Sequence, residues 1–305
     1  SIEDVYISTN LNYRDLVIDQ LPAIPERNIL CEPVGRNTAP CIGLGASYIA
    51  KKYGDAVMFV FPSDHLIRNV GLFAETVDNA AKIAEAGENL VTLGMTPTYP
   101  ETGYGYIKFN SFQQRIGGFA VDKFVEKPVI EKAVKYVKSG EYLWNSGIFV
   151  WKVSVILSKL ERFVPDTYRC LNVIKSAIGT RAEATVLAEE FPKTDSISID
   201  YAVLEKSDDI FTVKADFDWN DVGSWLALER IQKADNDGNI FDGDVLAVQS
   251  KNTIVQGTKR LVALVGMENV IVVDSDDAIL ICDKQHTEHI KDLISTMKAS
   301  NRVEL

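Results

Sequence analysis

Apolar and polar positions in the first part of the chain follow the pattern of strands that alternate with helices. An apolar run at 56–61 ends at Pro62 and indicates a buried strand, which we expect to be central in its sheet. Apolar residues recur at helical spacing in 39–52 and 73–84, and a further strand is expected at 90–93. This alternation favours an α/β fold around a mostly parallel sheet.

Beyond residue 117 the pattern mixes strands and helices less regularly, and beyond 235–239 it changes again. Strands are expected at 121–125 and 147–151, and helices at 130–138, 153–163, 182–189 and from 200 onward. The last segment holds short β-branched runs at 244–249, 253–256, 261–265, 270–273 and 278–282, before an amphipathic helix at 286–297. We therefore expect two domains, 1–234 and 235–305, the second a small all-β domain built as a β-helix or a sandwich.

Composition narrows the classes of function. The 305 residues carry 32 Lys and Arg against 43 Asp and Glu, a formal charge of -11, which argues against binding to nucleic acid or to an anionic membrane surface. No apolar run approaches the roughly 20 residues that cross a bilayer. The acidic start and the four scattered cysteines are typical of a cytoplasmic protein with neither a secretory leader nor a disulfide framework.

Two polar segments stand where an α/β sheet places its ligands. EPVGRNTAP (32–40) opens a helix, so that Arg36, Asn37 and Thr38 could meet an anion or the polar edge of a base, or simply cap the helix. FPSDH (61–65) follows the apolar strand. Its Asp64 could hold Mg²⁺ at the carboxyl end of that strand, or be only a helix cap.

Further segments combine glycines, aromatic residues and polar groups. In TGYGYI (102–107), Gly103 and Gly105 would let the backbone approach a ligand. In FVEKP (124–128), Glu126 could accept from sugar hydroxyls and Lys127 could neutralise a phosphate, although neighbours on a strand point to opposite faces unless a bulge turns them. WNSGIF (144–149) and DWNDVGSW (218–225) suit a sugar pocket, or a core tryptophan beside a turn.

The order of these segments, together with SIDYAVLEK (198–206), closely resembles bacterial mannose-1-phosphate guanylyltransferase, also called GDP-mannose pyrophosphorylase. The resemblance implies a Rossmann-like nucleotidyltransferase domain with a mixed central sheet, followed by a left-handed β-helix-like domain. It implies attack of mannose 1-phosphate on the α-phosphorus of GTP, which gives GDP-mannose and pyrophosphate. The product would serve polysaccharide biosynthesis, and the β domain could pair two chains into a homodimer.

The same resemblance assigns roles to residues of this chain. Asp64, Lys127 and Asp221 would be catalytic, with Asp64 and Asp221 holding Mg²⁺ and Lys127 meeting the sugar phosphate. Nucleotide-binding residues would be Arg36, Asn37, Thr38, Pro62 and Ser63, and sugar-binding residues Gly103, Tyr104, Glu126 and Asn145. Because the attacking phosphate is already anionic at neutral pH, positioning and charge neutralisation would suffice without a general base.

One feature of the family is not found in this sequence. The family begins with a strand and a Gly-rich loop of the type GGxGTRLWPLSR, followed by a PKQF segment, which together wrap the triphosphate. From the resemblance we expect a sheet without that strand to expose apolar surface. Two alternatives to the guanylyltransferase therefore stand: a nucleotidyltransferase for another sugar or base, and a non-catalytic protein that binds sugar nucleotides.

Overall fold

The chain divides into two compact units in a computed structural model, which describes residues 1–257, 259–300 and 302. The first unit comprises Ser1–Ser63 and Ile67–Trp219, and the second comprises Asp64–Leu66 and Asn220–Leu305. The division runs through the short strands β4 (Leu66–Ile67) and β10 (Trp219–Asn220). The boundary near residue 235 that the sequence suggested stays a prediction.

Apart from β4 and β10, the described residues of the first unit form eight strands and eight α-helices. The strands are β1 (Ile7–Asn10), β2 (Ile29–Glu32), β3 (Val57–Val60), β5 (Leu90–Met95), β6 (Tyr106–Arg115), β7 (Gly118–Val125), β8 (Tyr142–Lys152) and β9 (Ile210–Ala215). The helices are α1 (Arg14–Gln20), α2 (Thr38–Tyr53), α3 (Val70–Glu85), α4 (Ile130–Ser139), α5 (Val153–Phe163), α6 (Pro165–Ala177), α7 (Glu183–Glu190) and α8 (Ile199–Ala202).

The main sheet is mixed, as the fold class anticipated. Its six strands lie in the order β3-β8-β5-β9-β7-β6. β5 and β9 run parallel, whereas β3–β8, β5–β8, β7–β9, β6–β7 and β6–β8 are antiparallel. The expectation of a mostly parallel sheet was wrong, because the long strand β8 enters between β3 and β5 in the opposite direction and β6–β7 is an antiparallel hairpin.

The apolar run at 56–61 forms β3, but this strand is not central. It pairs with β8 and stands at the end of the sheet order, while β1 and β2 form a separate parallel pair. Its apolar character has another cause: Met58 is buried in the core, and the rings of Phe59 and Phe61 lie 6.3 Å apart with Phe61 packing on Phe73 at 5.6 Å. Phe59 and Phe61 are nevertheless 40% and 47% exposed, so the apolar run marks neither a central strand nor a fully buried one.

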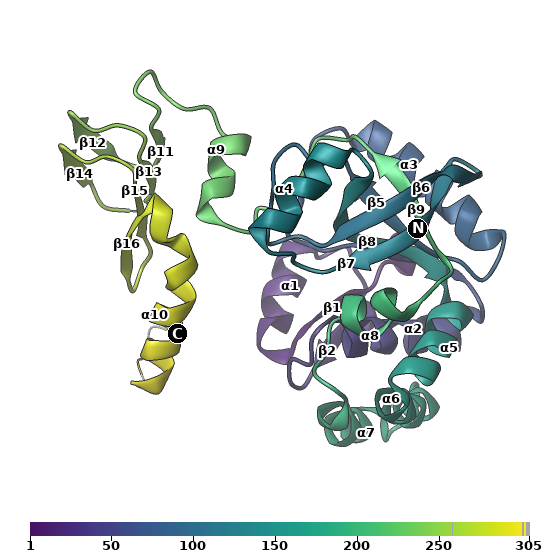
Figure 1. The fold of residues 1–305 in the computed structure, drawn as a ribbon. Coiled ribbons are helices and arrows are strands. Elements are labelled where there is room, and N and C mark those ends of the chain that lie inside the picture. Colours follow the sequence, from purple (N-terminus) through teal and green to yellow (C-terminus); the bar gives the residue numbers. More distant parts are fainter. Residues whose placement is uncertain (258, 301, 303–305) are drawn as a thin grey trace. The chain divides into compact units, whose positions relative to one another are not determined.

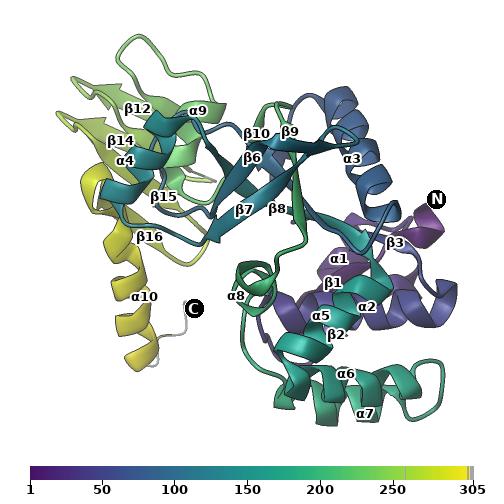
Figure 2. The same ribbon diagram turned by 45° about the vertical axis from the view of Figure 1, so that its right-hand side comes forward.

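Helices cover both faces of the sheet (Figures 1 and 2). α3 packs on β5, β8 and β9 on one face, while α2 and α5 pack on each other and on β3 and β8 at the opposite face. α6 and α7 extend the layer of α2 and α5. No helix among the described residues is both long and apolar enough to cross a membrane.

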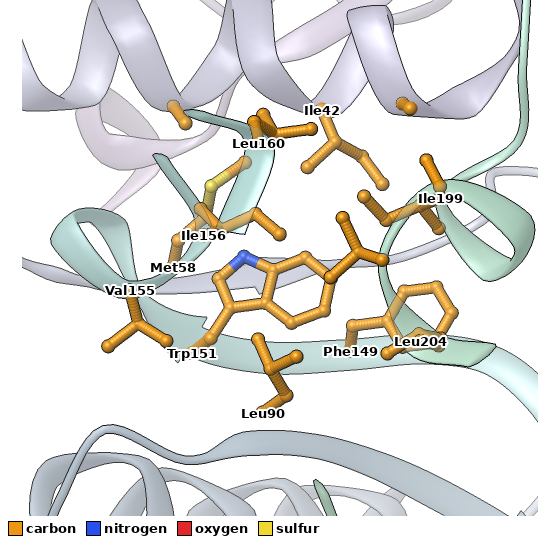
Figure 3. Packing of buried hydrophobic residues seen from close by; sticks show 14 of the residues in the cluster. Ile42, Met58, Leu90, Phe149, Trp151, Val155, Ile156, Leu160, Ile199 and Leu204 are labelled. Atoms are coloured by element: carbon orange, nitrogen blue, oxygen red, sulfur yellow. The ribbon is translucent and has the colours of Figure 1, made fainter. Parts of the chain in front are cut away.

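Trp151 of β8 lies at the centre of the core between the sheet and the α2–α5 layer. Its side chain is fully buried among Ile42, Ile156 and Leu160, with the Phe149 ring stacked at 5.2 Å (Figure 3). A strand with helices on both faces buries side chains on both, so the second half of β8, Ile148–Trp151, is a continuous apolar run that follows Asn145 and Ser146. This packing fixes the strand that carries Asn145.

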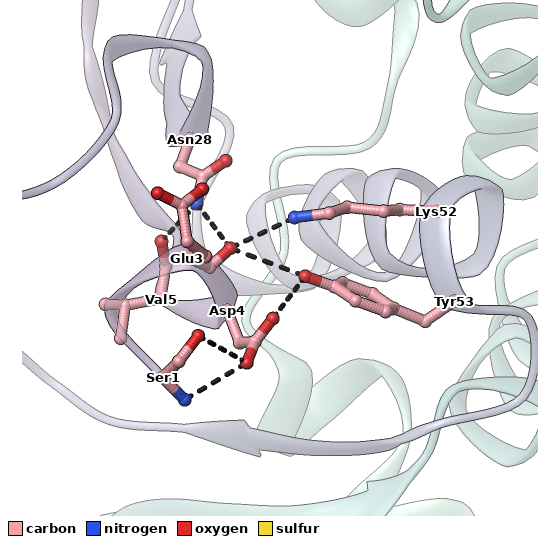
Figure 4. Close-up of polar contacts among 7 residues, drawn as sticks. All are labelled: Ser1, Glu3, Asp4, Val5, Asn28, Lys52 and Tyr53. Carbon is pink, nitrogen blue, oxygen red and sulfur yellow. Dashed lines mark hydrogen bonds and ion pairs between the residues drawn. The ribbon is translucent and has the colours of Figure 1, made fainter.

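Polar contacts fasten the first residues to α2 (Figure 4). The side-chain amide of Asn28 donates to the backbone carbonyls of Glu3 and Val5 at 3.0 and 2.9 Å, and Lys52 Nζ donates to the Glu3 carbonyl at 3.0 Å. Tyr53 Oη donates to Asp4 Oδ1 at 2.5 Å. These bonds satisfy backbone groups outside the sheet, as buried and half-buried polar groups require.

The second unit is a β-helix rather than a sandwich. Its elements are α9 (Leu228–Ile231), β11 (Ile240–Asp242), β12 (Val245–Val248), β13 (Ile254–Gln256), β14 (Val262–Val265), β15 (Val270–Asp274), β16 (Ile279–Asp283) and α10 (Ile290–Ala299). β11, β13 and β15 pair in parallel, so that Ile240, Ile254 and Ile271 stack in one buried column. β12 and β14 form a second parallel face. Parallel stacking of successive turns distinguishes this architecture from the antiparallel sheets of a sandwich.

Candidate functional site

The turn after β7 brings Glu126 and Lys127 together. Lys127 adopts a left-handed backbone conformation with φ of 43°, which ends the alternation of the strand. Its Nζ lies 3.4 Å from Glu126 Oε1. The Glu126 side chain is 9% exposed and the Lys127 side chain 60% exposed, so a buried carboxylate is paired with a cation that solvent can reach. The sequence made this pairing conditional on a bulge; the structure brings the two side chains together through the left-handed residue Lys127, which follows the end of β7.

Glu126 is poised to accept a hydrogen bond. Its Oε2 is buried and accepts none from the residues that the structure describes. Burial raises the pKa of the Glu126 carboxyl, the negative charge of Asp200 adds to that rise, and Lys127 opposes it. A buried acceptor without a donor costs free energy, so a ligand hydroxyl or N–H group that reached Oε2 would relieve the cost.

Asn145 of β8 is held by partners from other elements. Its Nδ2 donates to Asp200 Oδ1 of α8 at 3.0 Å, and its Oδ1 accepts from Thr92 Oγ1 of β5 at 2.9 Å. The backbone N–H of Gly147, a residue with φ of 72°, also points to Oδ1 at 3.4 Å. Burial raises the pKa of Asp200, and the bond from Asn145 opposes that rise. The amide is therefore fixed in one orientation.

Gly105 joins Glu126 and Asn145 into one site. Its carbonyl accepts from the Asn145 backbone N–H at 2.8 Å. A Cβ at this position would lie 2.5 Å from Glu126 Oε2 and 3.3 Å from Asn145 Cβ, so both side chains pack close against the glycine. The close approach at Gly105 is made here to protein side chains, and a larger residue would require the Glu126 carboxylate to move.

The two other predicted residues of this segment have different surroundings. The backbone N–H of Gly103 donates to Glu101 Oε1 at 2.8 Å. Tyr104 is 9% exposed, with its ring 5.3 Å from that of Trp144 and 5.4 Å from that of Trp219. An aromatic cluster therefore supports the loop, and contact of Gly103 and Tyr104 with a ligand stays a prediction.

The segment 36–38 forms the N-terminus of α2. Asn37 has φ of 68° and caps the helix, its Oδ1 accepting from the Thr38 N–H at 2.8 Å. Thr38 Oγ1 accepts from the Ile199 N–H at 2.8 Å, and Arg36 donates to the carbonyl of Pro192. Each side chain thus has a structural partner, and Asn37 has the capping role that the sequence left open for Asn37 or Thr38. Pro62 is half-buried and Ser63 exposed directly after β3. Nucleotide binding by these residues stays a prediction.

Asp64 and Asp221 both belong to the second unit. The Asp64 side chain is 82% exposed, with Oδ1 4.0 Å from His65 Nε2, and Asp221 Oδ1 accepts from the Gly223 N–H at 3.2 Å. Burial lowers the pKa of His65, whereas the charges of Asp64 and Asp221 raise it.

This donor set suits Mg²⁺. Within the described ranges, no three His, Cys, Asp or Glu side chains gather as a metal cluster. Mg²⁺ is commonly held by one or two carboxylates together with substrate phosphates, so two aspartates fit it, whereas a closed zinc site would need more ligands.

Sequence reasoning missed Thr92 and Asp200. Asp200 lies within SIDYAVLEK, but an acidic residue in the first turn of a helix is ordinarily a favourable partner of the helix dipole and attracts no other interpretation. Thr92 is a single hydroxyl in the buried strand β5, and nothing in the sequence pattern marked it. Their partner Asn145 is more than fifty residues away from each in sequence.

A surface cavity of about 250 Å³ lies elsewhere in the first unit. It is lined by residues from the first 28 positions, from α2, from the segment after α6 and from the start of α7, among them Tyr6, Arg27, Tyr48, Lys51 and Glu183. None of the predicted site residues borders this cavity. The candidate site therefore rests on the convergence of Glu126, Lys127 and Asn145, not on this hollow.

Comparison with known proteins agrees with the fold. The family model described as "Nucleotidyl transferase" matches residues 1–238, and that described as "MannoseP isomerase/GMP-like beta-helix domain" matches 243–297. The solved structure of "mannose-1-phosphate geranyltransferase" from Thermus thermophilus superposes with a TM-score of 0.83 and 28% identity, covering 95% of this chain and 83% of that one.

Curated relatives are similar over almost the whole chain. "Xanthan biosynthesis protein XanB" of Xanthomonas campestris pv. campestris is 41% identical over 98% of this chain and 63% of its own length. "Mannose-1-phosphate guanylyltransferase" of Escherichia coli K12 is 38% identical over 99% of this chain and 65% of its own length. The chain thus spans less than two thirds of the length of these relatives. It belongs to the nucleotidyl transferase family, with a GMP-like β-helix domain after the nucleotidyltransferase domain.

Proposed function

We propose that the protein is a mannose-1-phosphate guanylyltransferase, which converts mannose 1-phosphate and GTP into GDP-mannose and pyrophosphate. The observation that carries the proposal is the convergence of Glu126, Lys127 and Asn145: a buried acceptor, an exposed cation and a fixed amide. A sugar phosphate needs hydrogen-bonding groups for its hydroxyls and a positive charge for its phosphate. The 36–41% identity to relatives that include named mannose-1-phosphate guanylyltransferases supports the choice of substrates.

In this mechanism an oxygen of the sugar phosphate forms a bond to the α-phosphorus of GTP. The bond from that phosphorus to the β-phosphate oxygen breaks, and pyrophosphate leaves with the electron pair. Lys127 would hold the attacking phosphate, while Glu126 and Asn145 hold the sugar and fix its direction. Catalysis then comes from orientation and charge neutralisation.

Mg²⁺ would be held by Asp64 and Asp221 and would supply charge neutralisation at the nucleotide phosphates. Arg36, Asn37, Thr38, Pro62 and Ser63 would line the nucleotide side, and Gly103 and Tyr104 the cleft between nucleotide and sugar. The helix terminus at Thr38 supports this assignment, because backbone N–H groups there favour polar or anionic ligand atoms. We further propose cytoplasmic synthesis of a glycan precursor by a homodimer.

The test is product formation by the full-length gene product. The protein is incubated with Mg²⁺ and each combination of GTP, ATP or UTP with mannose 1-phosphate or glucose 1-phosphate, and both pyrophosphate and sugar nucleotide are quantified. GDP-mannose as the dominant product supports the proposal. Preference for another base or sugar would make the protein a related nucleotidyltransferase, and GDP-mannose binding without turnover would make it a non-catalytic binding protein.

A further inference from the structure

We infer that Thr92 and Asp200 are positioning residues that set the orientation of the Asn145 amide and leave one of its N–H donors for the sugar. The inference rests on the proposed function and specifies how its sugar site selects a substrate. The ligand group that fits is a hydroxyl of the sugar ring, because a hydroxyl can accept from one partner and donate to another.

The hydrogen-bonding capacity of Asn145 is almost fully used by the protein. Its Oδ1 faces two donors, Thr92 Oγ1 at 2.9 Å and the Gly147 N–H at 3.4 Å. Its Nδ2 carries two hydrogens, one of which goes to Asp200 Oδ1 at 3.0 Å. A backbone N–H can only donate and a carboxylate only accept, so these partners fix which end of the amide is nitrogen. What remains is one N–H.

Glu126 supplies a hydrogen-bond acceptor where Asn145 supplies a donor. Its Oε1 lies by Lys127 Nζ, while its buried Oε2 receives no donor from the part of the chain that the structure describes. Both Oε2 and the Asn145 side chain lie close to Gly105, within 2.5 and 3.3 Å of where a Cβ would stand. A sugar hydroxyl that met both side chains would accept from Asn145 and donate to Glu126, which would satisfy both groups at once. A site built in this way rejects an analogue without that hydroxyl, because both protein groups are then left unpaired.

Thr92 can be tested against a closely matched control. Thr212 stands directly opposite Thr92 in the register of β5 and β9, it is equally buried, and its Oγ1 makes no hydrogen bond with the described residues. Thr92→Val and Thr212→Val therefore make the same chemical change on paired strands. Only Thr92→Val removes a donor from Asn145.

The experiment uses the full-length gene product with mannose 1-phosphate and its monodeoxy analogues at saturating GTP. For one analogue the wild type should lose roughly 10- to 150-fold in kcat/KM, as expected for a lost hydrogen bond to a charged group. In Thr92→Val and Asp200→Ala, KM for mannose 1-phosphate should rise about tenfold and discrimination against that analogue should shrink by about tenfold. Asp200→Asn, which keeps an acceptor oxygen, and Thr212→Val should retain the wild-type ratio within about threefold. KM for GTP should not change.

The outcomes distinguish failure of the positioning roles of Thr92 and Asp200 from failure of the proposed guanylyltransferase activity. A merely structural role of Thr92 or Asp200 would lower the thermal midpoint and leave the discrimination ratio intact, which would overturn this inference. Equal behaviour of Thr92→Val and Thr212→Val would overturn it as well. Loss of turnover and of GDP-mannose binding in the wild type would instead overturn the proposed function and the inference with it. Wild-type turnover of another sugar would overturn only the choice of mannose, and the same comparison on that sugar's deoxy analogues would decide the inference.

Discussion

Gly105→Ala is the smallest change that reaches the sugar site. The added methyl carbon would lie 2.5 Å from Glu126 Oε2 and 3.3 Å from both Asn145 Cβ and Phe124 Cζ. Ordinary contact begins about 1 Å further out than the first of these distances, so the carboxylate must turn away. Gly105 has no left-handed backbone angle, so the backbone itself tolerates alanine and the effect comes from the side chains.

The size of the expected loss in kcat/KM follows from the hydrogen bond that the displaced Glu126 carboxylate would no longer make to the sugar. A hydrogen bond to a charged group contributes about 1.5–3 kcal/mol, and each 1.4 kcal/mol corresponds to a factor of ten. Because Glu126 is only 9% exposed, solvent does not screen this contribution strongly. The expected loss in kcat/KM for mannose 1-phosphate is therefore roughly 10- to 150-fold. Overpacking should also cost about 1–3 kcal/mol of unfolding free energy.

The assay is pyrophosphate release at varied mannose 1-phosphate and saturating GTP, accompanied by urea unfolding. Gly71→Ala serves as the control, because a Cβ there meets its nearest neighbour at 3.8 Å in the exposed first turn of α3. The control should keep its activity and its stability. If Gly105→Ala is folded and retains the wild-type kcat/KM, Glu126 does not hold the sugar and the reasoning fails.

Three further predictions address pH, metal and core. Because the pKa of Glu126 is raised, kcat/KM for the sugar phosphate should fall as the pH drops through a value above the ordinary carboxyl range. Asp200→Asn removes a negative neighbour of Glu126 and should move this acidic limb of the pH–rate profile to lower pH. An acidic limb that does not move would contradict the assignment. Asp221→Asn, or chelation of Mg²⁺, should reduce turnover by about 100-fold or more while the circular dichroism spectrum and melting midpoint stay unchanged, and retained turnover would refute the metal assignment. Ile156→Ala, in the fully buried cluster around Trp151, should cost about 2–5 kcal/mol in urea unfolding, against about 0.5 kcal/mol for Val173→Ala on the exposed side of α6, and equal costs would contradict the packing described.

The periodicity of the sequence was a reliable guide to local elements. α2, α3, α4 and α5 lie where apolar residues repeat at helical spacing, and β12 to β16 lie at the short β-branched runs. Sheet topology was less accessible: the run 56–61 forms a strand at the end of the sheet order, in which Met58 is buried while Phe59 and Phe61 are exposed. An apolar run does not record which strand lies beside it.

In the candidate site, too, some residues had a local sequence signal and others are brought in only by the tertiary fold. Glu126, Lys127 and Asn145 stood out because polar groups beside glycines and aromatic residues suggest a ligand. The pairing of Lys127 with Glu126 accompanies the left-handed backbone conformation of Lys127, which a lysine at that position does not predict. Asp200 and Thr92 reach Asn145 from elements that are distant in sequence. A contact of that kind is created by the tertiary fold, so a single sequence contains no local signal for it.

The most direct test of the central claim compares Lys127→Met with wild type in the full-length gene product. Lys127 is 60% exposed, so its replacement should leave folding intact, and Lys123→Met on the exposed part of β7 is a matched control. The quantity to measure is kcat/KM for mannose 1-phosphate at saturating GTP. If the sugar phosphate is held beside Glu126 and Asn145, Lys127→Met should lose roughly 10- to 150-fold while KM for GTP and the control variant stay unchanged. Wild-type values for Lys127→Met would show that the sugar phosphate binds elsewhere.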